Sequence, residues 1–487
     1  MISRSEARSR IRAAGGEALE ERLDHLDATW SERCAVTPPA GLSAPDRGAR
    51  PDYDVVLAGG GLSLLLAPLL AERGLSVAVF DRARVGGVHR EWNAGRRELD
   101  ALRESGLFSA ADLDALIVAR YARGVCRWHG GGAYPVTGVL DLAFDAGRLL
   151  GQARALAERR GVALFDGHTL LGHAAGPTAV NLRFDARDGR RREVTTRILV
   201  DARGAASPYA TADLICPTVG GVVTGLTEGD ADDLVRRDTG EILATTEGVE
   251  EGRQHLWEAF PGRAGEVTIY LFHYARAADV GRGALLDLFA RFFQRLPTYK
   301  RGDARLLRPT FGYIPGWSRL GPAPAPPGPR VALVGDAAAR HSPLTFCGFG
   351  ASVRSLSASA DALARAVESP RGVPGSIVGD APVHAGTGAL ARLMAMPSPD
   401  PARAGELNDL LDVAFGTLHR MGGDAYASLL RDEMPPAELV RFLSIVAAAR
   451  PRVFRDVLDA LGVTSVSRWG LGLARELLRR ADRPRLG

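Results

Sequence analysis

A stretch of about 30 residues near the start of the chain constrains its fold more than any other. The apolar run Asp54–Ala58 has the continuous pattern of a parallel strand that is buried on both faces. A helical pattern follows over Leu62–Arg73 and is closed by Gly74 as a C-cap. Ser76–Phe80 then has the pattern of a second strand. Strand, helix and strand together make a βαβ unit, so we predict an α/β domain with a parallel sheet.

The turn after the first strand carries the glycines of a dinucleotide-binding fingerprint. Gly59 suits the tight turn, and Gly61 suits the close approach of the backbone to a pyrophosphate at the N-terminus of the following helix. Asp81 ends the second strand, where an acid is expected to hold the ribose hydroxyls. Leu64 stands where a third Gly or Ala is usual, which puts the close packing of helix against strand in question. We predict that Gly59, Gly61 and Asp81 bind a dinucleotide.

Two later motifs resemble elements of FAD enzymes. Arg84, Gly86 and Gly87 resemble the Arg-x-Gly-Gly element that follows the second strand in many of them. The turn that ends at Gly204 resembles the Asp-Ala-Thr-Gly turn of two-dinucleotide-type flavoproteins, with Arg203 in place of Thr. The resemblance implies that these residues belong to the same cofactor site.

The most specific motif follows another buried strand, at residues 330–334. Gly335 and Asp336, followed by Gly348 and Gly350, resemble the second FAD fingerprint of the aromatic-hydroxylase-like superfamily. The resemblance implies that Asp336 binds the ribityl chain and that the glycines let a helix N-terminus face the flavin. We therefore expect FAD, and not NAD, as the main cofactor.

Two further segments resemble the CruA/CruP-type lycopene cyclases within this superfamily. Residues 91–99 and 106–108 resemble that family's Glu-Trp-Asn-Ile-Ser-Arg-x-Glu-Leu…Gly-Leu-Phe segment, with Ala94-Gly95 in place of Ile-Ser. Residues 257–261 and 268–274 look like its substrate-domain strands. The resemblance runs unevenly from about residue 52 to about residue 430, and its departures leave a related enzyme with another substrate open.

The resemblance implies an acid-catalysed, non-redox isomerisation of an apolar terpenoid or carotenoid. A polyene end group is protonated, the carbocation closes to a ring and a proton is lost, while FAD in its reduced form stabilises the charge or relays the proton. The proton donor must be a carboxylic acid in apolar surroundings, because burial raises a carboxyl pKa. Glu258 is the first candidate, since Trp257 and Phe260 flank it and their rings can stabilise a cation. Glu91 is the second; a solvent-facing Glu258 and a structural Glu91 are the alternatives.

Two other classes of function stay open. One is a redox flavoenzyme, either a monooxygenase or a prenyl/polyene reductase that consumes NAD(P)H, for which the product mass would change. The other is a non-catalytic flavoprotein that binds a polyene or a membrane partner, with which the altered positions Leu64 and Arg203 are compatible. The sequence contains no second nucleotide-binding fingerprint, so we predict no dedicated NAD(P)H domain, and NAD(P)H stays a candidate electron donor.

The order of these patterns predicts a Rossmann-like FAD-binding domain that is interrupted by a β-rich substrate domain. We assign residues 51–215 and 330–370 to the discontinuous FAD-binding domain and residues 216–329 to the substrate domain. Residues 1–50 form a helical leader, and residues 371–487 form a C-terminal helical region.

Composition limits the partners of the chain. The formal net charge is only +4 and the arginines are scattered, which gives no reason to expect a nucleic-acid partner. Four widely spaced cysteines without a CxxC pair argue against a zinc site and against disulfides, so we expect no metal and a cytoplasmic protein. Helices expected near 404–420, 437–449 and 452–480 suit either core packing or peripheral membrane contact, with Trp469 as an interfacial anchor.

Overall fold

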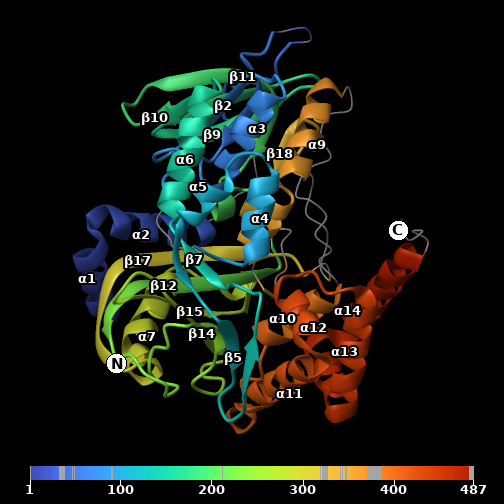
Figure 1. The fold of residues 1–487 in the computed structure, drawn as a ribbon. Coiled ribbons are helices and arrows are strands. Elements are labelled where there is room, and N and C mark those ends of the chain that lie inside the picture. Colours follow the sequence, from blue (N-terminus) through green and yellow to red (C-terminus); the bar gives the residue numbers. More distant parts are fainter. Residues whose placement is uncertain are drawn as a thin grey trace.

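A computed structural model describes most of the chain, and its described parts form an α/β fold. Figure 1 shows one sheet with its helices at the top, a second sheet below it, and a group of helices at the C-terminal end of the chain. The description covers residues 2–31, 39–46, 48, 50–88, 92–210, 212–318, 320, 327–339, 342, 344–345, 348–369 and 385–481.

The first sheet contains the predicted βαβ unit. Its strand order is β8-β2-β1-β11-β10-β9, with β18 beside β11, and β8, β2, β1, β11 and β18 run parallel. One face of β1, β2 and β11 packs on α3, α6 and α9, and the other face of β1 and β2 is also buried, so these two strands are mainly apolar, as the sequence predicts. The elements are β1 (Tyr53–Ala58), η1 (Leu62–Leu65), α3 (Leu66–Glu72), β2 (Val77–Asp81), α6 (Ala146–Arg159), β8 (Ala163–Asp166), β9 (His168–Ala175), β10 (Val180–Ala186), β11 (Arg191–Asp201), η2 (Gly204–Ala206), β18 (Val331–Leu333), η4 (Gly335–Ala337) and α9 (Leu356–Glu368).

The second sheet has the order β16-β12-β15-β14-β13-β5-β6, with β17 beside β12. One of its faces packs on α7 and on the N-terminal helices α1 and α2, and the other faces the C-terminal helices. The elements are α1 (Arg4–Gly15), α2 (Glu17–Ser31), β5 (Arg123–Arg127), β6 (Ala133–Val136), β12 (Leu214–Leu226), β13 (Thr239–Ala244), β14 (His255–Pro261), β15 (Glu266–His273), β16 (Ala275–Arg276), η3 (Ala277–Asp279), α7 (Ala284–Tyr299) and β17 (Gly302–Gly316).

A small sheet of order β3-β7-β4 joins the two larger ones. Helix α4, labelled in Figure 1, packs on α8, which contains Gly348 and Gly350 of the second predicted fingerprint. The elements are β3 (Trp92–Ala94), α4 (Arg96–Glu104), α5 (Ala110–Asp114), β4 (Ile117–Arg120), β7 (Leu142–Phe144) and α8 (Gly348–Arg354).

The described part of the C-terminal region, residues 385–481, is mainly helical, in agreement with the sequence pattern, although α10 and α12 were not anticipated. Helix α14 packs on α10 and α13 and bends at Gly462, where the backbone leaves helical geometry. None of the described helices is long and apolar enough to cross a membrane. The elements are α10 (Ala385–Ala395), η5 (Pro401–Arg403), α11 (Glu406–Met421), α12 (Gly423–Leu430), α13 (Pro436–Ala449) and α14 (Val453–Ala481).

The sheet membership corrects one part of the predicted domain division. Residues 51–215 were assigned to the FAD-binding domain, yet β5 and β6 lie within that range and belong to the second sheet. They join it because β5 pairs in parallel with β13, and its side chain Cys126 is fully buried in the core of that part. Residues 51–215 therefore contribute to both sheets. The other predicted boundaries stay predictions.

Candidate functional site

Four of the predicted cofactor motifs meet at one edge of the first sheet. The register pairs Ala58 with Phe80 of β2 and with Asp201 of β11, and Asp201 in turn pairs with Leu333 of β18. The segments that begin at Gly59, Asp81, Ala202 and Val334 therefore leave neighbouring parallel strands at their carboxyl ends. In open α/β sheets this edge is where ligands bind.

Gly59 and Gly61 have different structural reasons to be glycine. Gly59 has φ +112°, and a Cβ there would lie 2.3 Å from the backbone oxygen of Ala202, so the chain itself requires glycine. Gly61 has φ −77°, and a Cβ there would have no other atom within 4 Å. Packing within the described chain therefore does not require glycine at residue 61, and the free space beside it fits the backbone approach of a dinucleotide.

The Asp81 carboxylate forms hydrogen bonds that hold this glycine turn in place. One of its oxygens accepts a hydrogen bond from the backbone N–H of Gly60 at 2.7 Å, and the other accepts from Ala83 at 2.7 Å. The carboxylate thus lies beside the glycine turn, at the end of β2, where the fingerprint expects it. Its predicted contact with a ribose stays a prediction.

Leu64 does not disturb the packing of the first helix. Residues 62–65 form a 3-10 turn before α3 begins, and Leu64 is fully buried in the core between β1 and α6. Gly86 leaves room for it, since a Cβ at residue 86 would come within 3.4 Å of the leucine side chain. With Leu64 at the third fingerprint position, the first turn is therefore a 3-10 turn, and the helix still packs against the strand.

The other predicted cofactor residues lie around the same edge. Arg84 is exposed, and its carbonyl accepts a hydrogen bond from the Gly87 N–H at 2.9 Å. Gly204 opens the turn after β11, where a Cβ would lie 3.9 Å from a carboxylate oxygen of Asp336, so the two turns are side by side. Gly335 and Asp336 form η4 directly after β18. Together these residues fit the donor set and the backbone space that a dinucleotide needs.

A buried ion pair, which sequence reasoning missed, holds the helix of the second fingerprint. Glu98 accepts from Arg354 of α8 at 2.6 Å, and its other oxygen accepts from the Gly95 N–H at 2.9 Å. Gly350 lies against this pair, since a Cβ there would be 2.8 Å from the Arg354 guanidinium. Gly348 begins the same helix. Glu98 stands in the segment that resembles the cyclases, but its partner lies 256 residues away, so no local pattern identifies the pair.

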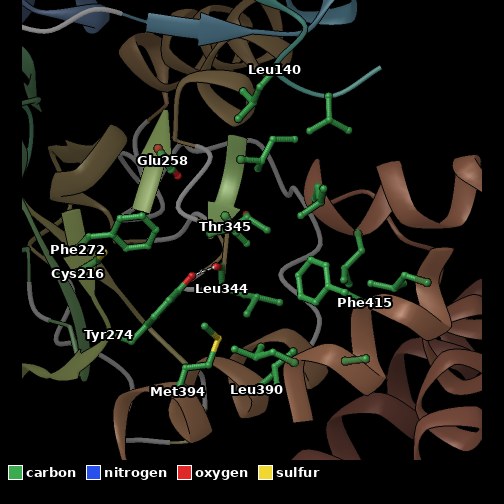
Figure 2. A pocket seen from close by; sticks show the side chains of 18 of the residues that line it. Leu140, Cys216, Glu258, Phe272, Tyr274, Leu344, Thr345, Leu390, Met394 and Phe415 are labelled. Carbon is green, nitrogen blue, oxygen red and sulfur yellow. Dashed lines mark hydrogen bonds between the residues drawn. The ribbon is translucent and has the colours of Figure 1, made fainter. Parts of the chain in front are cut away.

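A largely apolar cavity of about 150 Å³ lies between the second sheet and the C-terminal helices. Figure 2 shows Glu258, Phe272 and Cys216 on its sheet side and Phe415 on its helix side. The lining residues are Trp128, Val139, Leu140, Cys216, Thr218, Ile242, Leu243, Glu258, Phe272, Tyr274, Ile314, Leu344, Thr345, Leu390, Met394, Leu411, Ala414, Phe415, Leu418, Leu429, Leu430 and Phe442.

The segment of the second fingerprint also forms part of the cavity wall. Leu344 and Thr345 follow Gly335 and Asp336 by eight to ten residues and line the cavity. The Tyr274 hydroxyl donates a hydrogen bond to the Leu344 carbonyl and ties this segment to β15, as Figure 2 shows. The cavity is therefore next to the segment that, in the resemblance, holds the flavin.

Glu258 is the single carboxyl group among the described residues that line the cavity. Burial raises its pKa from about 4.5 to about 8. The side chain keeps some accessible surface because it faces the cavity, and no described residue forms a hydrogen bond or ion pair with it. At neutral pH the carboxyl group is therefore mainly protonated and can act as an acid.

The predicted aromatic neighbours of Glu258 were partly wrong. Successive side chains of a strand point to opposite faces, so Trp257 lies on the other side of the sheet, where it stacks on Tyr299 at 4.6 Å between ring centres. Phe260 is on the same face as Glu258 but is not among the lining residues. The aromatic rings that line the cavity belong to Trp128, Phe272, Tyr274, Phe415 and Phe442.

Two unpaired polar groups accompany Glu258 in the cavity wall. The indole Nε1 of Trp128 and the hydroxyl of Thr345 are buried and have no hydrogen-bond partner among the described residues.

Glu91, the second predicted acid, lies outside the described residues. The described part of the chain contains no group of three or more His, Cys, Asp or Glu side chains that could hold a metal ion.

Comparison with protein-family profiles found no matching family, and comparison with curated proteins found no match. Solved structures do match. A geranylgeranyl bacteriochlorophyll reductase-like protein from Thermoplasma acidophilum is 16% identical, with a TM-score of 0.53 over 84% of this chain and 99% of that one. A flavoprotein/dehydrogenase from Cytophaga hutchinsonii is 14% identical, with a TM-score of 0.54 over 82% and 100% of the two chains.

Halogenase PltM is similar in the same way. It is 13% identical, with a TM-score of 0.56 over 89% of this chain and 97% of that one. The same halogenase has been solved in complex with phloroglucinol and FAD; that structure has a TM-score of 0.54 and 14% identity and covers 89% and 93% of the two chains. The chain therefore has the fold of FAD-dependent oxidoreductases and halogenases, as the two fingerprints predict.

Proposed function

We propose that the protein is an FAD-dependent, lycopene-type cyclase in which Glu258 protonates the end group of an apolar polyene. The observation that carries the proposal is the position of the Glu258 carboxyl in a cavity lined almost entirely by apolar and aromatic side chains, where burial raises its pKa to about 8. A carboxyl group in such surroundings is suited to protonate a carbon–carbon double bond, because it keeps its proton at neutral pH. The resemblance of residues 91–108 and 257–274 to the CruA/CruP-type cyclases supports the choice of reaction.

The proposed reaction is balanced without an oxidant or a reductant. The Glu258 proton adds to one carbon of the terminal double bond, and the electron pair of that bond forms the new C–H bond. The carbocation on the other carbon is attacked by a second double bond, which closes the ring. The Glu258 carboxylate then takes back a proton from a carbon next to the new cation. The product is an isomer of the substrate, and Glu258 is protonated again.

Aromatic rings of the cavity are placed to stabilise the intermediate cation. Phe272 and Phe415 line opposite sides of the cavity, on the sheet and on the helices (Figure 2). A cation over the face of such a ring is stabilised by about 0.5–2 kcal/mol. The largely apolar wall also disfavours water beside the cation, which water would otherwise capture as an alcohol.

FAD would be held at the edge of the first sheet by the turns at Gly61, Asp81 and Asp336. When bound there in reduced, anionic form, it supplies negative charge near the cavity. The roles of these residues, and of Glu91 as a second acid, stay part of the proposal.

A prenyl or polyene reductase that consumes NAD(P)H is the second candidate. The likeness to the geranylgeranyl bacteriochlorophyll reductase-like protein, which spans 99% of that chain, favours it. Saturation of a double bond also needs a proton donor in an apolar site, so Glu258 fits this reaction as well. The two candidates differ in the mass of the product.

The test is to express the chain in lycopene-producing cells and to separate the extracted pigments by chromatography and mass. An isomer of lycopene is expected. A gain of two hydrogens would assign the reductase, and a gain of one oxygen would assign a monooxygenase. Glu258→Gln should abolish the product and keep the flavin content, whereas Glu104→Gln on the exposed face of α4 should change neither. Full activity of Glu258→Gln would remove Glu258 from the mechanism.

A further inference from the structure

Helix α14 exposes an unusual number of large apolar side chains. Of the eight large apolar side chains that are exposed in the described part of the chain, six are on this helix. Phe454 and Leu458 are one helical turn apart before the bend, and Leu471 and Leu478 are two turns apart after it, so each pair shares a face. The six are Phe454, Leu458, Val463, Leu471, Leu477 and Leu478, with exposed fractions from 36% to 72%.

The buried face of α14 is already occupied. Leu473 is buried in the core that surrounds the cavity, and the Arg468 guanidinium donates a hydrogen bond to the Leu320 carbonyl at 2.7 Å. Trp469, predicted as an interfacial anchor, is on this inner side, where it packs against Leu320 and Leu461. For Trp469 the core-packing alternative therefore holds, and on the outer face the exposed leucines are the candidates for membrane contact. In Figure 1, α14 lies at the edge of the molecule with the C-terminus at its tip.

Positive charge accompanies the outer apolar face. Residues 450–481 contain seven Arg and three acidic residues, an excess of four positive charges, while the whole chain has a net charge of +4. Arg450 and Arg452 precede the helix, and α14 itself contains five Arg and three acidic residues, an excess of two positive charges. Arg455 is 85% exposed, and Arg475 is also exposed.

We propose that the outer face of α14 binds the surface of a bilayer that contains anionic phospholipids. Exposed leucines enter the boundary between headgroups and acyl chains, and the neighbouring guanidinium groups pair with lipid phosphates. A second copy of the chain is a poorer partner, because pairing of two such helices would bring two positively charged segments together. The buried face of α14 packs on α10, which lines the cavity through Leu390 and Met394. The bilayer would therefore lie one helix layer away from the cavity.

Sedimentation of the full-length protein with vesicles tests this proposal without any enzyme assay. We expect the protein to sediment with vesicles of phosphatidylcholine and phosphatidylglycerol at low salt and to remain in solution with phosphatidylcholine alone. Leu471→Gln/Leu478→Gln should weaken binding about tenfold or more, since both leucines lose their burial in lipid. Leu171→Gln/Leu307→Gln, which alters the two exposed leucines outside α14, is the matched control and should bind like the parent protein.

A second pair of variants tests the charge. Arg455→Gln/Arg475→Gln should lower binding to the anionic vesicles, whereas Arg190→Gln/Arg191→Gln, at an exposed turn of the first sheet, should not. Equal thermal melting of all variants excludes a folding defect. Failure of the parent protein to sediment, or equal sedimentation of the two leucine variants, would overturn the proposal. So would a lipid-free dimer that only the α14 variants dissociate, because the face would then be an interface between copies.

Discussion

Replacing Glu258 with Gln should make the folded protein more stable at neutral pH. A carboxyl pKa that burial raises from about 4.5 to about 8 means that the folded state keeps a proton which the unfolded state releases. Unfolding then becomes easier as the pH rises through this interval, because the unfolded chain binds fewer protons. An amide of the same shape does not ionise, so the variant lacks this pH dependence.

The size of the effect follows from the displacement of the pKa. One pKa unit corresponds to about 1.4 kcal/mol, so ionisation of Glu258 favours the unfolded chain by about 1 kcal/mol at pH 5 and by about 4 kcal/mol at pH 8. The difference in the free energy of unfolding between Glu258→Gln and the parent protein should therefore widen by about 3 kcal/mol across this interval. Above pH 8 the difference should level off.

Urea unfolding of the apoprotein, followed by far-ultraviolet circular dichroism at several pH values from 5 to 9, measures this difference. Glu104→Gln, at an exposed residue, should show no such widening. A constant difference between Glu258→Gln and the parent protein would mean that the carboxyl is not held in its neutral form. A difference of the opposite sign would mean that Glu258 is paired as a carboxylate, and either result would refute its role as a buried acid.

Three further predictions concern the cofactor edge and the two faces of the second sheet. Gly59→Ala should destabilise the apoprotein by about 3 kcal/mol or more in urea unfolding, because its Cβ would collide with the backbone. Gly61→Ala should leave apoprotein stability unchanged. It should instead weaken FAD binding, measured by flavin fluorescence, about tenfold. Glu98→Ala should cost about 2 kcal/mol in the same unfolding assay, because it removes the shorter of the two carboxylate contacts of the Arg354 guanidinium and leaves the one to Glu433. Trp257→Leu should lower the free energy of unfolding by about 3 kcal/mol and leave kcat unchanged. Phe272→Leu, in the cavity, should lower kcat about tenfold. Equal loss of kcat in both variants would contradict the assignment of Trp257 and Phe272 to opposite faces of the sheet.

The βαβ unit and its turn could be predicted from the sequence because each depends on neighbours in the chain. Continuous apolar runs identify β1 and β2, and a glycine with positive φ at residue 59 is a local requirement of the turn between them. Leu64 was harder to interpret, because its position depends on a 3-10 turn and on the space that Gly86 leaves on another segment. A fingerprint describes the usual packing and does not report how a residue on another segment accommodates a departure from it.

The identity of the candidate acid could be inferred, but its surroundings could not. Glu258 was chosen for the aromatic residues beside it in sequence, and the alternation of a strand places Trp257 on the opposite face. The two-residue period of β14 alone would have corrected this choice. The rings that do line the cavity with Glu258, such as Phe272 and Phe415, belong to another strand and to a helix.

The arrangement of the cavity explains why no single motif identifies the reaction. Its walls come from the second sheet, from the segment of the second fingerprint and from helices α10 to α13, which no local pattern joins. The fold is shared with a reductase-like protein, a dehydrogenase and a halogenase of low identity, so the fold cannot distinguish between their reactions. What differs in such a fold is the group that faces the substrate. In the proposed reaction that group is Glu258, and a carboxyl with a raised pKa and no partner among the described residues of an apolar cavity favours protonation of carbon over the transfer of oxygen or halogen.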